Sequence, residues 1–265
     1  MNYKFLETTL EKKVLQVKLN RPEVHNAFNQ EMIGELLDLL GTLDKREDVR
    51  LILFRGNGKS FSSGADLNYM RQQAGMTGDE NYEDALQLAK LFYSIYSCNK
   101  PVISIAHGNV AGGANGIIAA SDYAISTNDT IFRFSEVRLG LVPATIAPYV
   151  IDRIGRARSA ELLLSGRSFS GVDAERYFLV NSSVSPAQLE NETTRIIQEF
   201  LKAAPGASME TKKLIRTLSE AVINEDRVES TARIIARARA SEEGQEGIKS
   251  FFESRKANWL NESIQ

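Results

Sequence analysis

The chain has 265 residues, of which 43% are hydrophobic and 25% charged, and its formal net charge at neutral pH is −2. This is the ordinary balance of a globular protein with a sizeable core in one or two domains, and the small net charge gives no reason to expect nucleic acid or an anionic membrane as a partner. One cysteine, Cys98, rules out an intrachain disulfide, and we expect it to be a buried thiol; no zinc-ligand spacing is present, so no metal site is predicted. Because no apolar run reaches membrane-spanning length and the first residues lack the apolar core of a secretory signal, we expect a cytoplasmic protein.

Strand and helix patterns alternate through the first half of the chain. Period-two alternation or short β-branched runs predict the strands, and apolar residues at helical spacing predict the helices. The predicted elements are a strand over 14–19, a helix over 28–43, a strand over 49–54, a helix over 84–97 and a strand over 101–106. The polar residues 71–83, with two glycines, are expected to form a mobile loop or lid.

The second half begins with mixed elements and ends in charged, amphipathic helices. The predicted elements are a helix over 114–120, strands over 123–126 and 131–134, helices over 147–154 and 159–164, and then helices over 186–204, 208–223, 226–240 and 243–254. This order predicts an α/β core followed by a helical tail. We place the core in residues 1–200 and the helical region in residues 201–265, with the best hinge signal at 202–208.

Two glycine-bearing turns stand out. The strand over 101–106 leads through Gly108 to Gly112 and Gly113, which open a helix of small residues, so unpaired N–H groups at the helix start could hold an oxyanion. Taken alone, this pattern favours a turn that merely lets a helix pack closely on a sheet. An earlier turn carries Gly64 between small residues, where the backbone can approach a ligand, although a surface loop explains it equally.

Several spaced segments together resemble the crotonase superfamily, the enoyl-coenzyme A hydratase and isomerase family. The matching segments are Asn20-Arg21-Pro22 with Asn26-Ala27, residues 61–67, Lys100-Pro101-Val102, Gly108 with Gly112-Gly113, Ser121-Asp122, residues 134–140, Gly166-Arg167 with Ala174, and residues 255–258. The resemblance spans essentially the whole chain and is specific in its joint order. It favours the oxyanion interpretation of the glycine turn.

The resemblance implies a crotonase-like α/β spiral of β-β-α turns that forms two sheets, with C-terminal helices that drive assembly into a homotrimer or homohexamer. It also implies an acyl-coenzyme A thioester as the ligand, so that coenzyme A is part of the substrate and no separate cofactor is expected. The thioester oxygen would accept hydrogen bonds from the backbone N–H groups of Ala65 and Gly113. Developing enolate charge on that oxygen would be stabilised by these fixed donors.

The resemblance further suggests which residues contact the substrate. The predicted substrate-binding residues are Asn26, Ala27, Ser63, Gly64, Asp66, Leu67, Gly112, Asn115, Arg138 and Lys256. Three of them have a plain alternative: Asn115 as a structural helix residue, Arg138 as a surface charge and Lys256 as a solvated tail charge, although Lys256 could reach a phosphate in a neighbouring subunit.

The carboxylates decide the chemistry. Typical hydratases of this family carry two glutamates, and the first position holds Gly116 here, whereas the second is Glu136. One glutamate leaves hydration with a single acid/base, or Δ3,Δ2-enoyl isomerisation; aryl dehalogenation needs an aspartate where Ala144 stands and is rejected. Burial of Glu136 between Phe134 and Val137 should raise its pKa toward neutrality.

The residues around Glu136, from Ser135 to Val150, look like those of bacterial 3-methylglutaconyl-coenzyme A hydratases. Such relatives act on a substrate with a distal carboxylate, for which Arg138 is the suggested partner. We therefore expect a hydratase of branched 2-enoyl thioesters. The isomerase is the alternative, and a catalytically silent acyl-coenzyme A binder is the reading from a different functional class.

Overall fold

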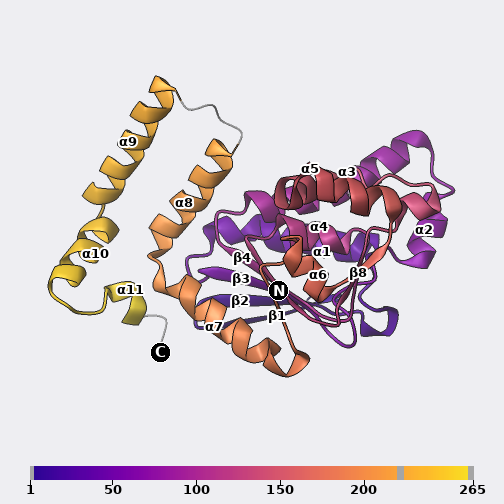
Figure 1. Ribbon diagram of the computed structural model, residues 1–265, viewed down its shortest axis with the longest axis horizontal. Helices are drawn as coiled ribbons and strands as arrows, with labels where there is room; N and C mark the ends of the chain where they lie inside the picture. Colours follow the sequence, from indigo (N-terminus) through magenta and orange to yellow (C-terminus); the bar gives the residue numbers. More distant parts are fainter. Residues whose placement is uncertain (1–2, 220–223, 262–265) are drawn as a thin grey trace.

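Two β-sheets organise the first two thirds of the chain (Figure 1). The computed structural model describes residues 3–219 and 224–261. Its strands are β1 (Leu6–Glu11), β2 (Val14–Leu19), β3 (Leu51–Gly56), β4 (Val102–Ala106), β5 (Asn109–Ala111), β6 (Tyr123–Thr127), β7 (Ile131–Arg133), β8 (Ser168–Ser170) and β9 (Ser182–Val184). The large sheet has the order β1-β2-β3-β4-β6-β9 and is parallel except for the β1-β2 hairpin; the small sheet has the order β5-β7-β8.

Helices alternate with strands as far as β9, and the later helices then follow one another without a strand among the described residues. The helices are α1 (Gln30–Thr42), α2 (Leu67–Gln73), α3 (Gly78–Ser97), α4 (Ala114–Ala120), α5 (Ala147–Ser165), α6 (Gly171–Arg176), α7 (Leu189–Lys202), α8 (Pro205–Leu218), α9 (Glu225–Ala240), α10 (Glu242–Phe252) and α11 (Asn258–Asn261). A repeating unit is visible in β4-β5-α4 and again in β6-β7-α5. In each unit the first strand lies in the large sheet, the second strand lies in the small sheet, and a helix follows. The expected α/β spiral of β-β-α turns is therefore confirmed.

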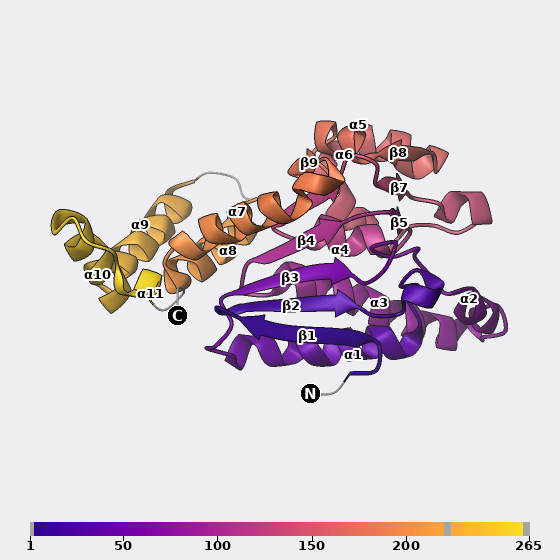
Figure 2. The same ribbon diagram turned by 90° about the horizontal axis from the view of Figure 1, so that it is seen from below.

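The large sheet is covered on both faces, which explains why its central strand β4 is apolar except for Ser104. Every residue of β4 is buried. The main core lies between this sheet and helices α1, α3, α4 and α5, whereas Ile196 of α7 packs with Leu53 and Ile103 on the opposite face (Figure 2). A parallel strand buried on both faces needs apolar side chains at successive positions.

The segment predicted as a mobile loop over 71–83 is mostly helical, so that prediction is wrong. Helix α2 ends at Gln73 and α3 begins at Gly78, where Thr77 and Glu80 form a reciprocal capping box. The Tyr69 hydroxyl donates a hydrogen bond to Asp84, which ties α2 to α3. A cap and a tertiary hydrogen bond favour helix formation here. Neither of them can be predicted from the polar composition of the segment.

Other boundaries differ in smaller ways. The strands β5, β8 and β9 were not predicted from the sequence, because strands of three residues carry little periodicity. The six-residue strand β1 was also not predicted, since its mostly exposed, polar sequence lacks a clear apolar alternation. Helix α5 is interrupted at Gly155, whose φ of 72° is not helical, and this agrees with the two helices predicted on either side. Cys98 is a buried free thiol, as predicted.

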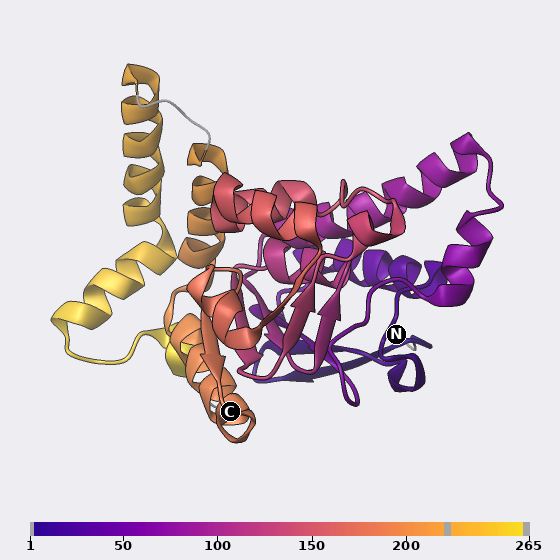
Figure 3. The same cartoon turned by 45° about the vertical axis from the view of Figure 1, so that its right-hand side comes forward.

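The C-terminal helices leave the spiral after α7 (Figure 3). Helix α8 is attached to the core by Lys212, whose Nζ lies 2.6 Å from Asp122 Oδ2 and 3.0 Å from the Lys100 carbonyl oxygen. Helices α9 and α10 stand apart from the sheets, and α10 exposes Phe251 and Phe252. Helix α11 returns to the core, where the Trp259 carbonyl oxygen accepts a hydrogen bond from Arg50 Nη1 at 3.1 Å. The end of the helix predicted over 208–223 lies outside the described residues. Within residues 3–219 and 224–261, no helix has the combination of length and apolar character needed to cross a membrane.

Candidate active site

The two glycine turns predicted from the sequence lie against each other. The Ser62 N–H donates to the Asn109 carbonyl oxygen, and the Ala111 N–H donates to that of Ser62, both at 3.1 Å. Gly64 has a φ of 90°, and a Cβ there would lie 2.8 Å from the Ala111 carbonyl oxygen. The Cβ position of Gly112 lies 4.0 Å from the Gly64 Cα. Both positions therefore need glycine, and the turns are in van der Waals contact.

Within the described part of the chain, each turn contains an accessible backbone N–H group that makes no hydrogen bond. Around Ala65, the Phe28 N–H donates to the Gly64 carbonyl oxygen at 2.6 Å and the Asp66 N–H donates to the Phe28 carbonyl oxygen at 2.9 Å. Among the described residues, nothing accepts a hydrogen bond from the N–H of Ala65 or of Gly113, the residue before α4. Ala65 is exposed and Gly113 is half-buried. Two accessible donors from two touching turns form an arrangement that can hold one oxyanion.

Glu136 faces this arrangement from the start of the 3-10 turn Glu136–Leu139, which follows β7. Its Oε1 lies 3.4 Å from the Cβ position of Gly112. Its Oε2 is buried and has no hydrogen-bond partner in the described part of the chain. Burial raises the pKa of the Glu136 carboxyl above that of an exposed glutamate, the direction expected from the sequence. A carboxylate in this state can take up and return a proton.

The position of the missing second carboxylate is filled by apolar side chains. A Cβ on Gly116 would lie 2.6 Å from Cε1 of Phe92 and 2.8 Å from Cγ2 of Ile146. The Cβ position of Gly113, one helical turn earlier, lies 3.6 Å from both Phe92 and Phe28. No acid at position 116 could be accommodated without moving the Phe92 ring.

Asn115 supports the second turn. Its Nδ2 donates to the carbonyl oxygens of Gly112 at 3.1 Å and of Arg133 at 3.0 Å. Its Oδ1 is buried and has no partner among the described residues. The amide thus has the structural function that was the alternative for this residue, and one acceptor remains that could hold water.

Asn26 and Ala27 shape the first turn from behind. Asn26 is fully buried, and its Nδ2 donates to the carbonyl oxygens of Asn57 and Ser60, both at 2.8 Å. Its Oδ1 accepts from the Arg21 N–H at 2.8 Å. The side chain predicted to bind substrate is therefore fully used inside the protein. Ala27 is buried and its carbonyl oxygen accepts from Arg21 Nη1 at 2.7 Å.

Asp66 caps α2 rather than facing a ligand. Its Oδ1 accepts from the N–H groups of Asn68 and Tyr69, and its Oδ2 lies 2.9 Å from Arg21 Nη2. Burial acts to raise the pKa of this carboxyl, but the two backbone hydrogen bonds and the Arg21 charge outweigh burial and lower the pKa. Arg21 connects the predicted motifs at 20–27 and 61–67.

Ser63 and Leu67 lie on the exposed side of the first turn. The Ser63 N–H donates to the His25 carbonyl oxygen at 2.9 Å, and its hydroxyl donates to the Val24 carbonyl oxygen. Leu67 is 73% exposed at the first position of α2. Both residues remain available to a ligand that approaches the Gly64 turn from solvent.

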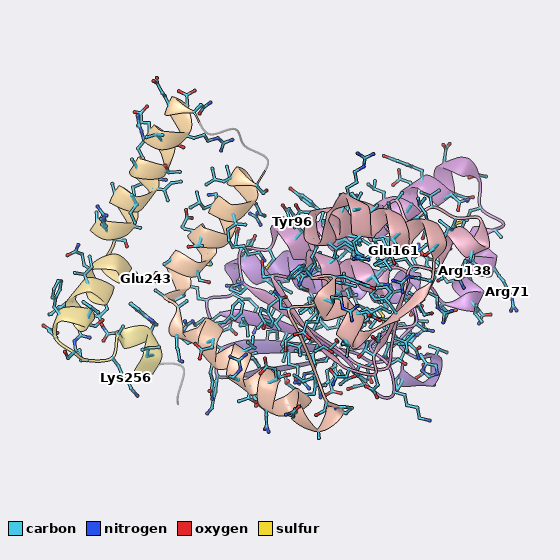
Figure 4. All side chains as sticks on the ribbon, in the orientation of Figure 1. Arg71, Tyr96, Arg138, Glu161, Glu243 and Lys256 are labelled. Atoms are coloured by element: carbon cyan, nitrogen blue, oxygen red, sulfur yellow. The ribbon has the colours of Figure 1, made fainter. Side chains whose placement is uncertain are left out.

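Arg138 and Lys256 do not reach the two turns. Arg138 is exposed, and its Nε donates to the Ser165 carbonyl oxygen at 3.2 Å. Figure 4 shows Lys256 on the C-terminal helical region, at the other end of the molecule from Arg138. Within one chain, Lys256 is therefore not grouped with Glu136, whereas Arg138 shares the 3-10 turn Glu136–Leu139 with it.

Sequence reasoning did not identify Phe92 or Ile146 as site residues. Phe92 has the spacing of an ordinary core position of α3, and Ile146 precedes α5, so neither carries a signal of its own. Gly116 is the indirect signal, because a glycine inside a helix often marks a close neighbour.

Comparisons with known proteins agree with this geometry. A family model described as Enoyl-CoA hydratase/isomerase matches residues 9–262. The crystal structure of an enoyl-CoA hydratase from Shewanella pealeana superposes with a TM-score of 0.94 at 36% identity and covers 97% of both chains.

Two curated relatives have names that point to different reactions. The crotonyl-CoA hydratase of Syntrophomonas wolfei is 29% identical over 98% of this chain and 100% of its own. The trans-2-decenoyl-[acyl-carrier-protein] isomerase of Streptococcus mutans is 29% identical over 81% of this chain and 82% of its own.

Proposed function

Since the chain belongs to the enoyl-CoA hydratase/isomerase family, we propose that it is a hydratase that adds water reversibly to a branched 2-enoyl-CoA such as 3-methylglutaconyl-CoA. The observation that carries this proposal is the Glu136 carboxylate, which lies beside the N–H groups of Ala65 and Gly113. Its Oε1 is 3.4 Å from the Cβ position of Gly112, and its buried Oε2 has no hydrogen-bond partner among the described residues. A proton acceptor and an oxyanion site in contact are the two parts that enoyl thioester chemistry requires.

The proposed mechanism uses one carboxylate twice. The thioester oxygen accepts hydrogen bonds from the N–H groups of Ala65 and Gly113. Glu136 takes a proton from water as the water oxygen bonds to C3, and the double-bond electrons move to the thioester oxygen to form an enolate. The protonated Glu136 then returns that proton to C2, which regenerates the carboxylate. Asn115 Oδ1 is the acceptor available to orient the water.

Gly116 supports single-carboxylate chemistry. The space of a side chain at this position is taken by Phe92 and Ile146, at 2.6 Å and 2.8 Å from its Cβ position. A second acid that protonates C2 independently of Glu136 therefore has no room.

The same apolar contacts favour a second candidate, a Δ3,Δ2-enoyl-CoA isomerase. In that reaction Glu136 removes a proton from C2 and returns it to C4, while the double bond moves from C3–C4 to C2–C3. No water takes part, and aromatic and aliphatic groups beside the reacting carbons exclude it. A catalytically silent acyl-CoA binder is the third reading, against which the retained Glu136 argues.

The branched substrate is the finer part of the proposal and depends on the sequence around Glu136. Arg138 donates to Ser165 in this structure, so a distal substrate carboxylate would need Arg138 to turn or another partner. Coenzyme A would lie along Ser63 and Leu67, on the exposed side of the first turn. We further propose a cytoplasmic homotrimer or homohexamer assembled through the C-terminal helices, in which Lys256 of one copy could meet the ligand phosphates of another.

The experiment mixes the protein with crotonyl-, 3-methylglutaconyl- or 3-hexenoyl-CoA and follows enoyl absorbance and product mass. A hydratase raises the mass of the first or second compound by one water, whereas an isomerase converts the third into a 2-enoyl isomer of unchanged mass. Glu136→Gln serves as the matched control and should abolish either change. Binding of all three compounds without any product would contradict the proposed function and favour the silent binder.

A further inference from the structure

We propose that Phe92 determines which acyl groups the site accepts. Its ring would close one side of the acyl site, and Glu136 lies on the other side of the Gly112-Gly113 turn. The proposal rests on the proposed function, because it takes the thioester oxygen to bind at Gly113. It assigns Phe92 as a specificity-determining residue for short acyl groups.

The first argument is the position of the ring. Phe92 Cζ lies 3.6 Å from the Cβ position of Gly113 and 2.7 Å from that of Gly116. Residues three apart on a helix share a face, so Gly113, just before α4, and Gly116, within α4, both turn their missing side chains toward the same ring. Carbons joined to a thioester held by the Gly113 N–H lie within a few bond lengths of that ring edge.

The second argument is that the ring is held in place. Phe92 is fully buried and meets Tyr149 of α5 edge-on, with ring centroids 6.3 Å apart. Tyr149 in turn contacts Tyr96 of α3, at 5.6 Å between centroids. Ile146, the residue before α5, approaches the same Gly116 position. A ring packed between three helices forms a rigid boundary, because protein interiors are close-packed.

The third argument is that Glu136 limits the opposite side of the turn. Its Oε1 lies 3.4 Å from the Cβ position of Gly112, whereas Phe92 contacts the next residue, Gly113. The acyl carbons next to the thioester would therefore lie between the Glu136 carboxylate, which must stay close to them, and the Phe92 ring, which is held in place by its neighbours. A longer chain must displace the ring, whereas a short acyl group need not.

The test measures dissociation constants of two unreactive ligands, butyryl-CoA and octanoyl-CoA, so that it does not depend on turnover. In Phe92→Ala, the preference for octanoyl-CoA over butyryl-CoA should increase by about tenfold or more, since one methylene in an apolar pocket already changes selectivity by about 10–200-fold. Phe92→Leu should give a smaller increase and covers the case in which the alanine variant fails to fold. Tyr93→Ala removes the next aromatic residue of α3, which is 62% exposed, and should leave the ratio unchanged.

An unchanged ratio in a folded Phe92 variant would overturn the proposal, and so would an equal increase in Tyr93→Ala. Turnover separates this result from the proposed function. If selectivity changes as expected but the wild type converts no enoyl-CoA, the proposed function fails and the assignment of Phe92 stands. If the wild type binds neither ligand, both fail.

Discussion

Gly116→Ala provides a direct test of how tightly the site is packed. In most helix interiors, alanine stabilises a protein by about 0.5–1 kcal/mol relative to glycine. Here the new Cβ would lie 2.6 Å and 2.7 Å from two ring carbons of Phe92 and 2.8 Å from Ile146 Cγ2. Overpacking a core costs about 1–3 kcal/mol, and contacts this short indicate the upper end. The clash outweighs the helix propensity, and we expect a net loss of about 2 kcal/mol.

The matched control is Gly34→Ala in α1. Gly34 is exposed, and nothing lies within 4 Å of its Cβ position, so this change should stabilise the protein by about 0.5–1 kcal/mol. Thermal unfolding at one fixed protein concentration should show a Tm about 4–8 °C lower for Gly116→Ala, because about 1 kcal/mol changes Tm by about 2–4 °C in chains of this size. The concentration is fixed because subunit assembly would make Tm depend on it.

A double variant identifies the cause. In Phe92→Leu/Gly116→Ala, the smaller side chain gives the new methyl group room, so the two losses should be less than additive. Equal stabilisation by Gly116→Ala and Gly34→Ala would refute the reasoning that Phe92 occupies this space. Strict additivity in the double variant would place the clash elsewhere.

Three further predictions concern the two turns and Glu136. Glu136→Gln should lower kcat by about 10²–10⁴ while acyl-CoA affinity, measured by calorimetry, stays close to that of the wild type. Burial raises the folded-state pKa of Glu136 above 4.5, so its charge destabilises the fold at neutral pH, and Glu136→Gln should exceed the wild type in urea stability there. The gain should shrink as the pH falls through the folded-state pKa toward 4.5, because below 4.5 the carboxyl is protonated in both the folded and the unfolded state. A gain that is constant with pH would contradict this. Gly64 has a φ of 90°, and a Cβ there would lie 2.8 Å from the Ala111 carbonyl oxygen. Gly64→Ala should therefore lower the free energy of unfolding in urea by about 1–3 kcal/mol and remove most of the turnover. Near-normal values of both would show that the two turns tolerate separation.

Much of the framework follows from local sequence properties. The strand that includes β4 and the helix that includes α1 were predicted because burial on two faces or on one face leaves a direct periodicity in the sequence. The need for glycine at Gly64 and Gly112 could likewise be inferred, since a φ near 90° or 52° is a property of single residues in a turn. The number of carboxylates was also decided by the sequence: Glu136 is present and position 116 has no side chain. These features depend on residue type and order alone.

The tertiary structure decided which groups meet, because contacts between distant segments leave no local pattern. It placed Phe92 of α3 in the space beside Gly116 and directed Asp66 toward Arg21 and the start of α2. It also directed the Nε of Arg138 to the Ser165 carbonyl oxygen. A glycine in the sequence shows only that a side chain is absent; the packed fold shows that a neighbouring ring fills its space. That contact excludes an acid at position 116, so the proposed acid/base chemistry rests on Glu136.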